Sequence, residues 1–375
     1  MHARRSRIVA TSVAAVVSVM AVAACGSSDD NSTSSQSAGA STGAAASKGG
    51  KIAFLLPESK TARYETQDRP LFEKKVKELC AGCQVVYSNA DQDASKQQQQ
   101  AEAALTQGVK VMVLDPVDGA AAAAIVNQAN AKKVPVISYD RLLLNSKPDY
   151  YVEFNSPSVG KIQGKALVDK LKADKKSGSI VMINGAPTDN NAKLFKQGAH
   201  SVIDGSGFKV AKEYDTPDWS PDKAQSEMEQ AITAVGKGKF VGVYAANDGT
   251  AGGAIAAMKS AGIDPKTIPV TGQDAEVAGI QRILAGEQYM TVYKPLKPLA
   301  DKAAEWATLL AQGKKPTDAT AKENNGKVDV ATIKLDVVPV TADKVKQTVI
   351  ADGFWKASEI CTSAYKAACS KYGIG

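Results

Sequence analysis

The chain has 375 residues and a formal net charge of +7 at pH 7, with 44% hydrophobic and 23% charged residues. The excess of positive charge is mild, and no block of lysine and arginine of the kind that follows a phosphate backbone occurs after residue 50, so charge gives no case for a nucleic-acid-binding protein. About 325 residues follow a polar N-terminal stretch, which is more than one typical core and predicts two lobes.

The first residues have the layout of a secretory signal. Three arginines precede an apolar stretch at 8–24 that is too short for a stable membrane span. The stretch ends in VAAC, which resembles the bacterial lipobox, in which the cysteine, here Cys25, is acylated and becomes the new N-terminus. The following segment is rich in Ser, Ala and Gly and cannot bury enough apolar surface to fold. The sequence predicts a lipoprotein signal peptide at 1–24 and a flexible tether at 25–50, the alternative being an ordinary signal peptide with a chance cysteine.

Short β-type runs then alternate with helix-type segments, which predicts βαβ units and a parallel sheet. The first series has expected strands at 51–56, 84–88, 111–114, 134–138 and 150–154, and expected helices near 68–79, 95–107 and 119–131. A second series follows, with expected strands at 179–183, 209–214, 240–244, 268–271 and 289–293, and expected helices up to 171 and at 191–204, 222–235, 251–261 and 276–285. The interpretation is an α/β fold of two doubly wound parallel-sheet lobes.

Apart from Cys25, the chain has four cysteines, namely Cys80, Cys83, Cys361 and Cys369. Exported chains keep disulfides, and four cysteines allow three pairings. We favour Cys80 with Cys83 and Cys361 with Cys369, because each pair closes a short loop beside a helical segment. The first pair also has the spacing of a redox dithiol, but it lies away from the polar clusters described next, which favours a structural disulfide.

Four of the expected strands end directly in hydrogen-bonding residues before the next helix begins. These clusters are Asp140-Arg141, Asp189-Asn190-Asn191, Asn247-Asp248 and Gln273-Asp274. In alternating βα chains the ligand crevice lies outside the carboxyl ends of the strands, so the clusters indicate one site. Carboxylates, amides and a guanidinium without a histidine suit a neutral polyol such as a sugar, whose hydroxyls both donate and accept.

Enzymatic functions fit the sequence poorly. The only histidines are His2 and His200, so no Ser-His-Asp or Cys-His arrangement accompanies a motif. No Walker loop is present, and the glycines at 249–253 lack the dinucleotide-binding spacing. Paired aspartates can serve a glycosidase, but those of this chain stand among basic or amide neighbours that keep them ionised. We therefore predict a binding protein, not an enzyme, without cofactor or metal.

Five stretches, in consistent order, resemble the D-xylose-binding branch of the type I periplasmic binding proteins of bacterial sugar uptake. They are 136–141 (VISYDR), 189–195 (DNNAKLF), 247–254 (NDGTAGGA), 272–275 (GQDA) and 290–295 (MTVYKP). The resemblance runs from about Lys51 to Glu359. It implies two lobes, joined by a hinge of three chain crossings, that close on a sugar.

The resemblance also implies the site. The residues that match polar sugar contacts are Lys60, Arg63, Asp140, Arg141, Asp189, Asn191, Asn247, Asp274 and Lys294. Trp219 matches the stacking tryptophan, while Tyr64 stands where the xylose binder has a second tryptophan. The alternatives are a solvated loop for Lys60 and Arg63, a structural salt bridge for the Asp-Arg pair, and a helix cap for Asp189. Asp248 is expected to cap a helix and not to contact the ligand.

The function implied by the resemblance is that of a membrane-tethered monomeric receptor. It delivers an aldopyranose, with D-xylose as the expected sugar, to the permease and ATPase of an ABC transporter. The expected lobes are 51–155 plus 297–336 and 157–294 plus 340–375, with crossings near 155–157, 294–297 and 336–340. One alternative is a receptor of broader specificity, for glucose, galactose or arabinose, that serves a signalling partner. Another is the effector domain of a sugar-responsive repressor, which would need an N-terminal DNA-binding segment where a signal and tether are expected.

Overall fold

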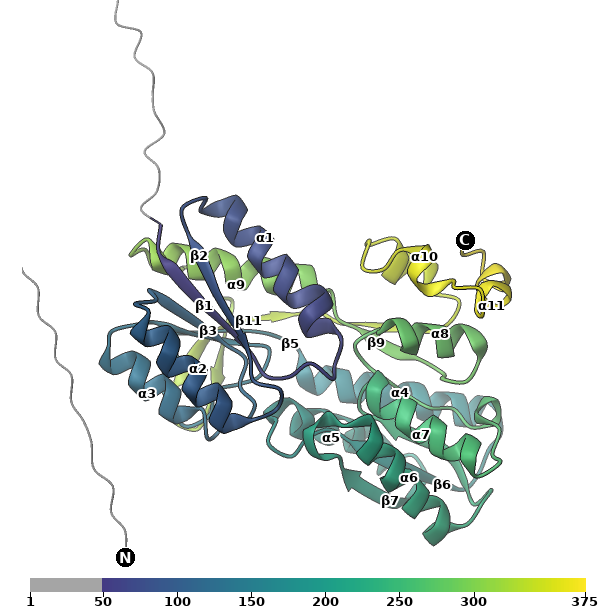
Figure 1. Cartoon of the computed structure of the whole chain (residues 1–375). Helices are drawn as coiled ribbons and strands as arrows, with labels where there is room; N and C mark the ends of the chain where they lie inside the picture. The colour runs from purple at the N-terminus through teal and green to yellow at the C-terminus, as the bar shows by residue number, and fades with distance from the viewer. Residues whose placement is uncertain (1–48) are drawn as a thin grey trace, which may run out of the picture. The chain divides into compact units, whose positions relative to one another are not determined.

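The computed structural model describes residues 49–375; the predicted signal peptide, Cys25 and nearly all of the predicted tether lie outside this part. The described chain forms two α/β lobes, shown in Figure 1, one around a seven-stranded sheet and one around a three-stranded sheet. We call them the N-terminal and the C-terminal lobe. Their helices cover both faces of each sheet, so the predicted doubly wound fold is confirmed. Within residues 49–375 no helix is long and apolar enough to cross a membrane.

The N-terminal sheet has the strand order β10-β11-β5-β4-β3-β1-β2. Its strands are β1 (Lys51–Leu56), β2 (Gln84–Asn89), β3 (Val111–Leu114), β4 (Val136–Tyr139), β5 (Tyr150–Phe154), β10 (Ala321–Asn324) and β11 (Asp329–Leu335). All neighbours are parallel except β10 and β11. The carboxyl ends of the parallel strands therefore lie at one edge of the sheet, where ligand sites of such folds occur.

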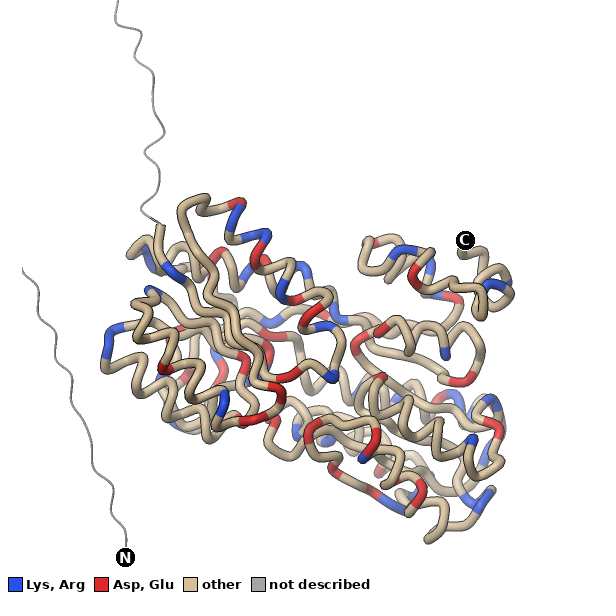
Figure 2. The backbone as a smooth tube through the Cα atoms, viewed as in Figure 1, with Lys and Arg blue, Asp and Glu red and all other residues tan. Residues whose placement is uncertain are grey.

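Side-chain alternation along the strands places one apolar set on each face of this sheet. Ile52, Phe54 and Leu56 of β1 pack in the core under α1 and α9, whereas Ala53 and Leu55 pack with α2 and α3 on the other face. The helices of this lobe are α1 (Arg69–Leu79), α2 (Ala94–Thr106), α3 (Ala123–Ala131) and α9 (Leu296–Ala311), with a π-helical turn η1 (Tyr64–Asp68) before α1. Basic and acidic residues both occur along α1 (Figure 2), and Arg69 pairs with Glu65 and Glu73 one turn away on either side.

The C-terminal sheet has the order β7-β6-β8. Its elements are β6 (Ser179–Asn184), β7 (Lys209–Asp215), β8 (Phe240–Ala245), α4 (Ser156–Ala173), α5 (Asn190–Ile203), α6 (Pro221–Val235), α7 (Asp248–Ser260), α8 (Val277–Ala285) and the short turns η2 (Pro217–Trp219) and η3 (Pro265–Thr267). Helices α4 and α5 pack closely because Gly160 has no side chain: a Cβ atom there would lie 1.8 Å from the carbonyl oxygen of Phe195. This contact fixes the position of α5 against α4.

The strand predicted at 268–271 is wrong. Only a single bridge joins Val270 to Val243 of β8. The ladder stops there because the Ala245 amide donates to the side-chain hydroxyl of Thr271, at 3.0 Å, and that hydroxyl donates to the Ala245 carbonyl, also at 3.0 Å. A side chain has thus replaced the backbone partner that a longer strand would need.

The chain passes between the lobes at three places: at Asn155 after β5, at Pro295 between β9 (Thr291–Tyr293) and α9, and between β11 and β12 (Val338–Val340). Strands β9 and β12 pair antiparallel with each other. Two of the crossings are therefore tied together by hydrogen bonds, and the connecting segments lie side by side.

The last residues, 341–375, contact both lobes. They include η4 (Lys346–Ile350), α10 (Ala357–Ile360) and α11 (Lys366–Lys371). The Phe354 carbonyl accepts from Gln67 of the N-terminal lobe at 3.0 Å, and Trp355 Nε1 donates to the Ala275 carbonyl of the C-terminal lobe at 2.8 Å. The segment thus connects η1 of the N-terminal lobe with the loop before α8 of the C-terminal lobe.

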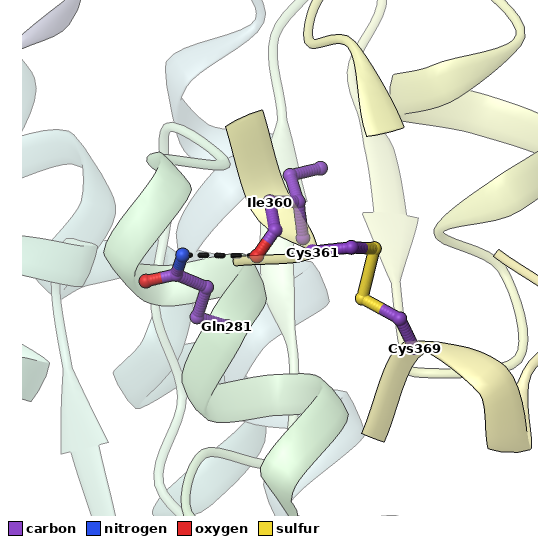
Figure 3. Close-up of a disulfide and its surroundings, with 4 residues drawn as sticks. All are labelled: Gln281, Ile360, Cys361 and Cys369. Carbon is purple, nitrogen blue, oxygen red and sulfur yellow. Dashed lines mark hydrogen bonds between the residues drawn. A yellow bond between two sulfur atoms is a disulfide. The ribbon is translucent and has the colours of Figure 1, made fainter. Parts of the chain in front are cut away.

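Both predicted local disulfides, Cys80–Cys83 and Cys361–Cys369, are present in the structure. Figure 3 shows that the second joins the end of α10 to α11, beside the hydrogen bond from Gln281 of α8 to the Ile360 carbonyl, 3.0 Å long. A short chain end with little core of its own is stabilised by such a cross-link, because the link limits the freedom of its unfolded state.

Candidate ligand-binding site

A cavity lies between the lobes, at the carboxyl ends of their strands. The space along its lining amounts to about 290 Å³, a volume that includes open solvent. The lining residues are Thr61, Arg63, Tyr64, Asp140, Arg141, Asp189, Asn191, Phe195, Trp219, Asn247, Gln273, Asp274 and Lys294. Members of all four strand-end clusters lie among them, so the structure brings these clusters together at one place.

Arg63 organises the N-terminal side of the cavity. Its Nε and Nη2 donate to the two carboxylate oxygens of Asp68, each at 2.8 Å. Its Nη1 lies 2.6 Å from Asp140 Oδ2 and 4.0 Å from Asp274 Oδ1 of the other lobe. Because the planar guanidinium matches a carboxylate with two parallel bonds, Asp68 fixes the orientation of Arg63 without help from a ligand.

Arg141 spans the cleft. Its Nη2 donates to the Tyr64 hydroxyl at 3.3 Å, and its Nε lies 3.1 Å from Asp189 Oδ2. The Tyr64 ring lies within reach of two cations, since the guanidinium carbon of Arg63 is 5.0 Å and that of Arg141 is 5.8 Å from the ring centre. These contacts hold Tyr64 in place by cation–π attraction as well as by its hydroxyl.

Two helix caps place polar side chains from the C-terminal lobe. Asp189 caps α5, with Oδ1 accepting from the Asn191 amide at 2.8 Å, and its Oδ2 accepts from Trp219 Nε1 at 3.1 Å. Asn247 caps α7, with Oδ1 accepting from the Thr250 amide at 2.8 Å. Asp189 therefore caps a helix, as the alternative interpretation expected, and also lines the cavity. Because the Asn247 oxygen is used by the cap, the group that Asn247 can offer to a ligand is its Nδ2 donor.

The predicted cap at Asp248 is wrong, because Asn247 holds that position. Asp248 is the first residue of α7, and its fully buried carboxyl group accepts from Gln288 Nε2 at 2.6 Å and from Thr291 Oγ1 at 3.1 Å. Burial raises the pKa of Asp248 to about 7, against the attraction of Arg282. Its role is to join α7 to the loop behind the cavity.

Three cavity residues have left-handed backbone conformations. The φ angles are 57° at Asp140, 54° at Trp219 and 89° at Asp274. Residues other than glycine seldom adopt such angles, and where they do the surrounding contacts must hold them. The Asp140 amide donates to the Val152 carbonyl at 3.0 Å and the Asp274 amide to the Val292 carbonyl at 2.9 Å, so neighbouring strands fix both carboxylates.

The pKa values of the buried carboxyl groups Asp140 and Asp189 shift in opposite directions. Burial raises the pKa of Asp140, but the positive charges of Arg63, Lys294 and Arg141 outweigh it, and the net shift is downward. Burial also raises the pKa of Asp189, where Arg141 only partly opposes it. Lys294 lies 3.0 Å from Asp274 Oδ1, and this carboxylate raises the pKa of Lys294 although burial lowers it. Asp140 is therefore a charged acceptor and Lys294 a charged donor.

Two amide oxygens at the cavity have no hydrogen-bond donor among the residues that the structure describes. They are Asn191 Oδ1 and Gln273 Oε1, both buried. The Asn191 amide nitrogen is in use, since it donates to the Asp140 carbonyl at 3.0 Å and to Glu153 Oε2 at 2.9 Å. Buried polar atoms are nearly always hydrogen-bonded, so these oxygens suit a ligand that donates.

Aromatic side chains supply the apolar part of the lining. Trp219 and Phe195 meet at 6.4 Å between ring centres with an interplanar angle of 61°. The Trp219 ring occupies the space beside Gly185, where a Cβ atom would lie 2.0 Å from it. The absence of a side chain at Gly185 thus allows the indole to reach the cavity.

The predicted site residues meet at the cavity with one exception. Lys60 is exposed and does not line it; its backbone amide donates to Glu58 Oε2 at 2.5 Å. The sequence prediction missed Thr61, Phe195 and Gln273. Gln273 directly precedes Asp274 at a strand end and Phe195 lies one helical turn after Asn191, so both positions carried a signal. Nothing in the sequence singles out Thr61.

Comparison with known proteins places the chain in a family. The model of the periplasmic binding protein domain matches residues 52–315. The D-xylose-binding periplasmic protein of Escherichia coli (strain K12) is 38% identical over 321 residues, which cover 84% of this chain and 94% of that protein. The multiple sugar-binding periplasmic receptor ChvE of Rhizobium radiobacter is 31% identical over 336 residues, which cover 84% of this chain and 94% of that protein.

Solved structures agree. A carbohydrate transporter solute-binding protein from Chloroflexus aurantiacus, in complex with D-glucose, superposes with a TM-score of 0.74 at 33% identity, covering 82% of this chain and 97% of that one. An ABC transporter solute-binding protein from Clostridium phytofermentans, with bound β-D-glucose, gives 0.74 at 28% identity, covering 83% and 99%. Fold and cavity define a two-lobed solute-binding protein, and its relatives are binding proteins rather than enzymes. The chain belongs to the periplasmic binding protein domain family.

Proposed function

We propose that this protein is an extracytoplasmic receptor that binds a neutral aldopyranose, D-xylose, between its lobes and delivers it to an ABC transporter. One observation carries the proposal: each buried cation of the cavity, Arg63, Arg141 and Lys294, already has a carboxylate partner, while Asn191 and Gln273 offer acceptors. An anionic solute would need an unpaired cation, because burying a lone charge is very unfavourable. A sugar needs donors, acceptors and a flat apolar surface.

The choice of D-xylose rests on the relatives. The D-xylose-binding periplasmic proteins of Escherichia coli and Haemophilus influenzae are each 38% identical to this chain over most of its length. The polar residues that the sequence resemblance assigns to sugar contacts also line the cavity, apart from Lys60.

A receptor for several aldoses is the second candidate. Tyr64 stands where the xylose binder has tryptophan, and a tyrosine ring covers less of a pyranose face. The similar structures with bound D-glucose and the similar multiple sugar-binding receptor favour the same view. Pentose and hexose differ by one hydroxymethyl group, a difference of about 1–3 kcal/mol in a fitted pocket.

The proposed mechanism is closure about a hinge. The lobes are 51–155 plus 297–336 and 157–294 plus 340–375, and they rotate about the three crossings. Closure joins Arg141 to Asp189 and Asn191 to the Asp140 carbonyl across the cleft. The closed pair of lobes presents a composite surface that a permease can distinguish from the open form.

Acylation of Cys25 is the proposed anchor, with residues 26–50 as the tether that lets the receptor reach its transporter. Two lobes tethered to a membrane in this way would stay at high local concentration around the permease.

A calorimetric screen tests the ligand. D-Xylose, D-glucose, D-galactose, L-arabinose and D-ribose are titrated, with D-glucuronate as the anionic comparison. We expect D-xylose to bind most tightly and D-glucuronate not to bind. Comparable affinity for two or more of the neutral sugars would favour the second candidate, and tight binding of D-glucuronate alone would exclude both.

A further inference from the structure

Glu153 lies beside the cavity but does not line it. It is in β5, one residue before its end, and is only 2% exposed. Oε1 accepts from the Phe154 amide at 2.6 Å, and Oε2 accepts from Asn191 Nδ2 at 2.9 Å. The Tyr151 hydroxyl lies 3.4 Å from Oε2, but it donates its one hydrogen to the Asp140 carbonyl at 3.0 Å. Each oxygen of the Glu153 carboxyl group therefore accepts one hydrogen bond, from the Phe154 amide and from Asn191.

The contact with Asn191 crosses from one lobe to the other and determines which way the amide points. Asn191 Nδ2 is surrounded by acceptors: Glu153 Oε2, the Asp140 carbonyl at 3.0 Å and Asp140 Oδ1 at 3.4 Å. An oxygen in that place would face three acceptors, so the network assigns the nitrogen there. The Asn191 oxygen is then the atom left for the cavity, where it is buried and receives no hydrogen bond from the described residues.

We propose that Glu153 is a positioning residue, which acts through Asn191 and fixes its amide across the closed cleft so that Oδ1 accepts a hydroxyl hydrogen of the bound sugar. The inference rests on the proposed function, since it needs a ligand with hydroxyl groups. It adds a rule of specificity: at one carbon of the sugar the receptor requires a group that donates a hydrogen bond, and a group that only accepts is rejected.

The substitution Glu153→Gln changes this geometry without changing the size of the side chain. The glutamine side chain has one acceptor oxygen, whereas the glutamate side chain has two. If that oxygen keeps the Phe154 amide, the new NH2 group faces Asn191 Nδ2, donor against donor. Rotation of the Asn191 amide by half a turn relieves the conflict and brings Nδ2 to the cavity, although the bond to the Asp140 carbonyl is then lost. Asn191 would donate where it had accepted.

Deoxy and deoxyfluoro analogues of D-xylose test whether Asn191 changes from acceptor to donor, because a C–F group cannot donate a hydrogen bond. In the parent protein we expect one ring position at which replacing the hydroxyl group by fluorine weakens binding about tenfold more than replacing it by hydrogen. The reason is that fluorine at this position faces the Asn191 oxygen. In Glu153→Gln, D-xylose should bind more weakly and the difference between fluorine and hydrogen at that position should disappear. Affinities are measured by calorimetry.

Three further variants sharpen the test. Glu153→Asp keeps two acceptor oxygens and should retain the selectivity at that position, even if its overall affinity falls. Combining Glu153→Gln with Asn191→Ala should give the same fluorine-to-hydrogen ratio as Asn191→Ala alone. Glu323→Gln, which removes a carboxylate paired with Lys334 on the edge of the same sheet, should bind every analogue like the parent.

The outcomes separate this inference from the proposed function. If the parent binds none of the sugars, both fail. If the parent binds D-xylose and rejects fluorine at one position, two results overturn only the role of Glu153. One is that Glu153→Gln keeps this selectivity. The other is that Glu153→Asp, which keeps both acceptor oxygens, loses it. An equal loss of affinity for all analogues in Glu153→Gln also overturns it, because that result indicates a general effect on closure.

Discussion

Arg141 of the N-terminal lobe and Asp189 of the C-terminal lobe face each other across the cleft, with Nε 3.1 Å from Oδ2 and both side chains almost wholly buried. The two residues come from different sheets: Arg141 follows β4 and Asp189 caps α5. In the proposed closure mechanism this ion pair forms only while the lobes are closed on each other, so it would contribute directly to the balance between open and closed forms.

Asp189→Asn tests that contribution. It leaves Arg141 buried without this partner, and breaking a buried pair costs about 3 kcal/mol or more, so the Kd for D-xylose should rise by roughly two orders of magnitude. Calorimetry measures the change. Asp169→Asn, which removes an exposed pair with Lys165 on α4, is the matched control and should bind like the parent. An unchanged Kd in Asp189→Asn would show that the pair does not affect closure.

Asp140→Ala and Asp274→Ala test the two carboxylates held in left-handed backbone. Each removes an acceptor for a sugar hydroxyl, and a desolvated hydroxyl without a partner costs about 1–3 kcal/mol, so binding should weaken by roughly one to two decades. Circular dichroism should show that the fold survives. If both variants bind every sugar of the screen like the parent, neither carboxylate contacts the ligand.

Trp219→Ala tests the aromatic surface. The chain has three tryptophans. Trp306 donates to Asp318 and Trp355 to the Ala275 carbonyl, and neither lines the cavity. We therefore expect ligand-induced fluorescence change in the parent and its near-complete loss in Trp219→Ala, with weaker binding. Trp219→Phe should lose the signal but keep more of the affinity. A fluorescence change that persists in both variants would mean that another tryptophan reports the ligand.

His200 should make stability depend on pH. Its Nδ1 is 2.8 Å from Asp204 Oδ1 and its Nε2 is 3.0 Å from Glu213 Oε1. Burial lowers the pKa of His200, but the hydrogen bonds to Glu213 and Asp204 together raise it above its usual 6.5. A group whose folded pKa is raised stabilises the fold at low pH, and this contribution is lost as pH rises through the folded pKa.

His200→Gln should therefore reduce the free energy of unfolding by up to about 1 kcal/mol near pH 5.5 and by less near pH 8.5. Urea denaturation of parent and variant at the two pH values measures the difference. The same loss at both values would indicate that the charge of His200 plays no part.

Cys25→Ala tests the anchor. Acylation needs the Cys25 thiol, so the variant should appear in the medium or remain unprocessed. Partitioning of parent and variant between detergent and aqueous phases measures it. Equal partitioning of the two proteins would contradict the lipoprotein prediction.

Much of the fold could be predicted from the sequence because its strands are short apolar runs with polar ends. β1, β3 and β5 have the predicted bounds. The error at 268–271 came from the hydroxyl of Thr271, which replaces a backbone partner only because Ala245 lies opposite in the folded chain. No pattern of neighbouring residues in the sequence predicts a contact of that kind.

The same distinction holds for the site. Asp140, Asp189, Asn247 and Asp274 could be predicted because parallel strands bring their carboxyl ends to one edge. Glu153 could not, because a glutamate within a strand is expected to point to solvent, whereas in the folded chain it is buried and contacts Asn191 of the second lobe. Lys60 follows the first strand as a binding residue would, yet the loop directs it outward.

The left-handed backbone at Asp140, Trp219 and Asp274 limits how the receptor can be re-engineered for other solutes. Exchanging any of these three side chains also changes the backbone preference, and a β-branched or bulky replacement would resist the required φ angle. Thr61, Phe195 and Gln273 line the same cavity in ordinary conformations, and none of them caps a helix. A library for a new biosensor specificity should be concentrated at these three positions, where side chains can change and the scaffold can stay as it is.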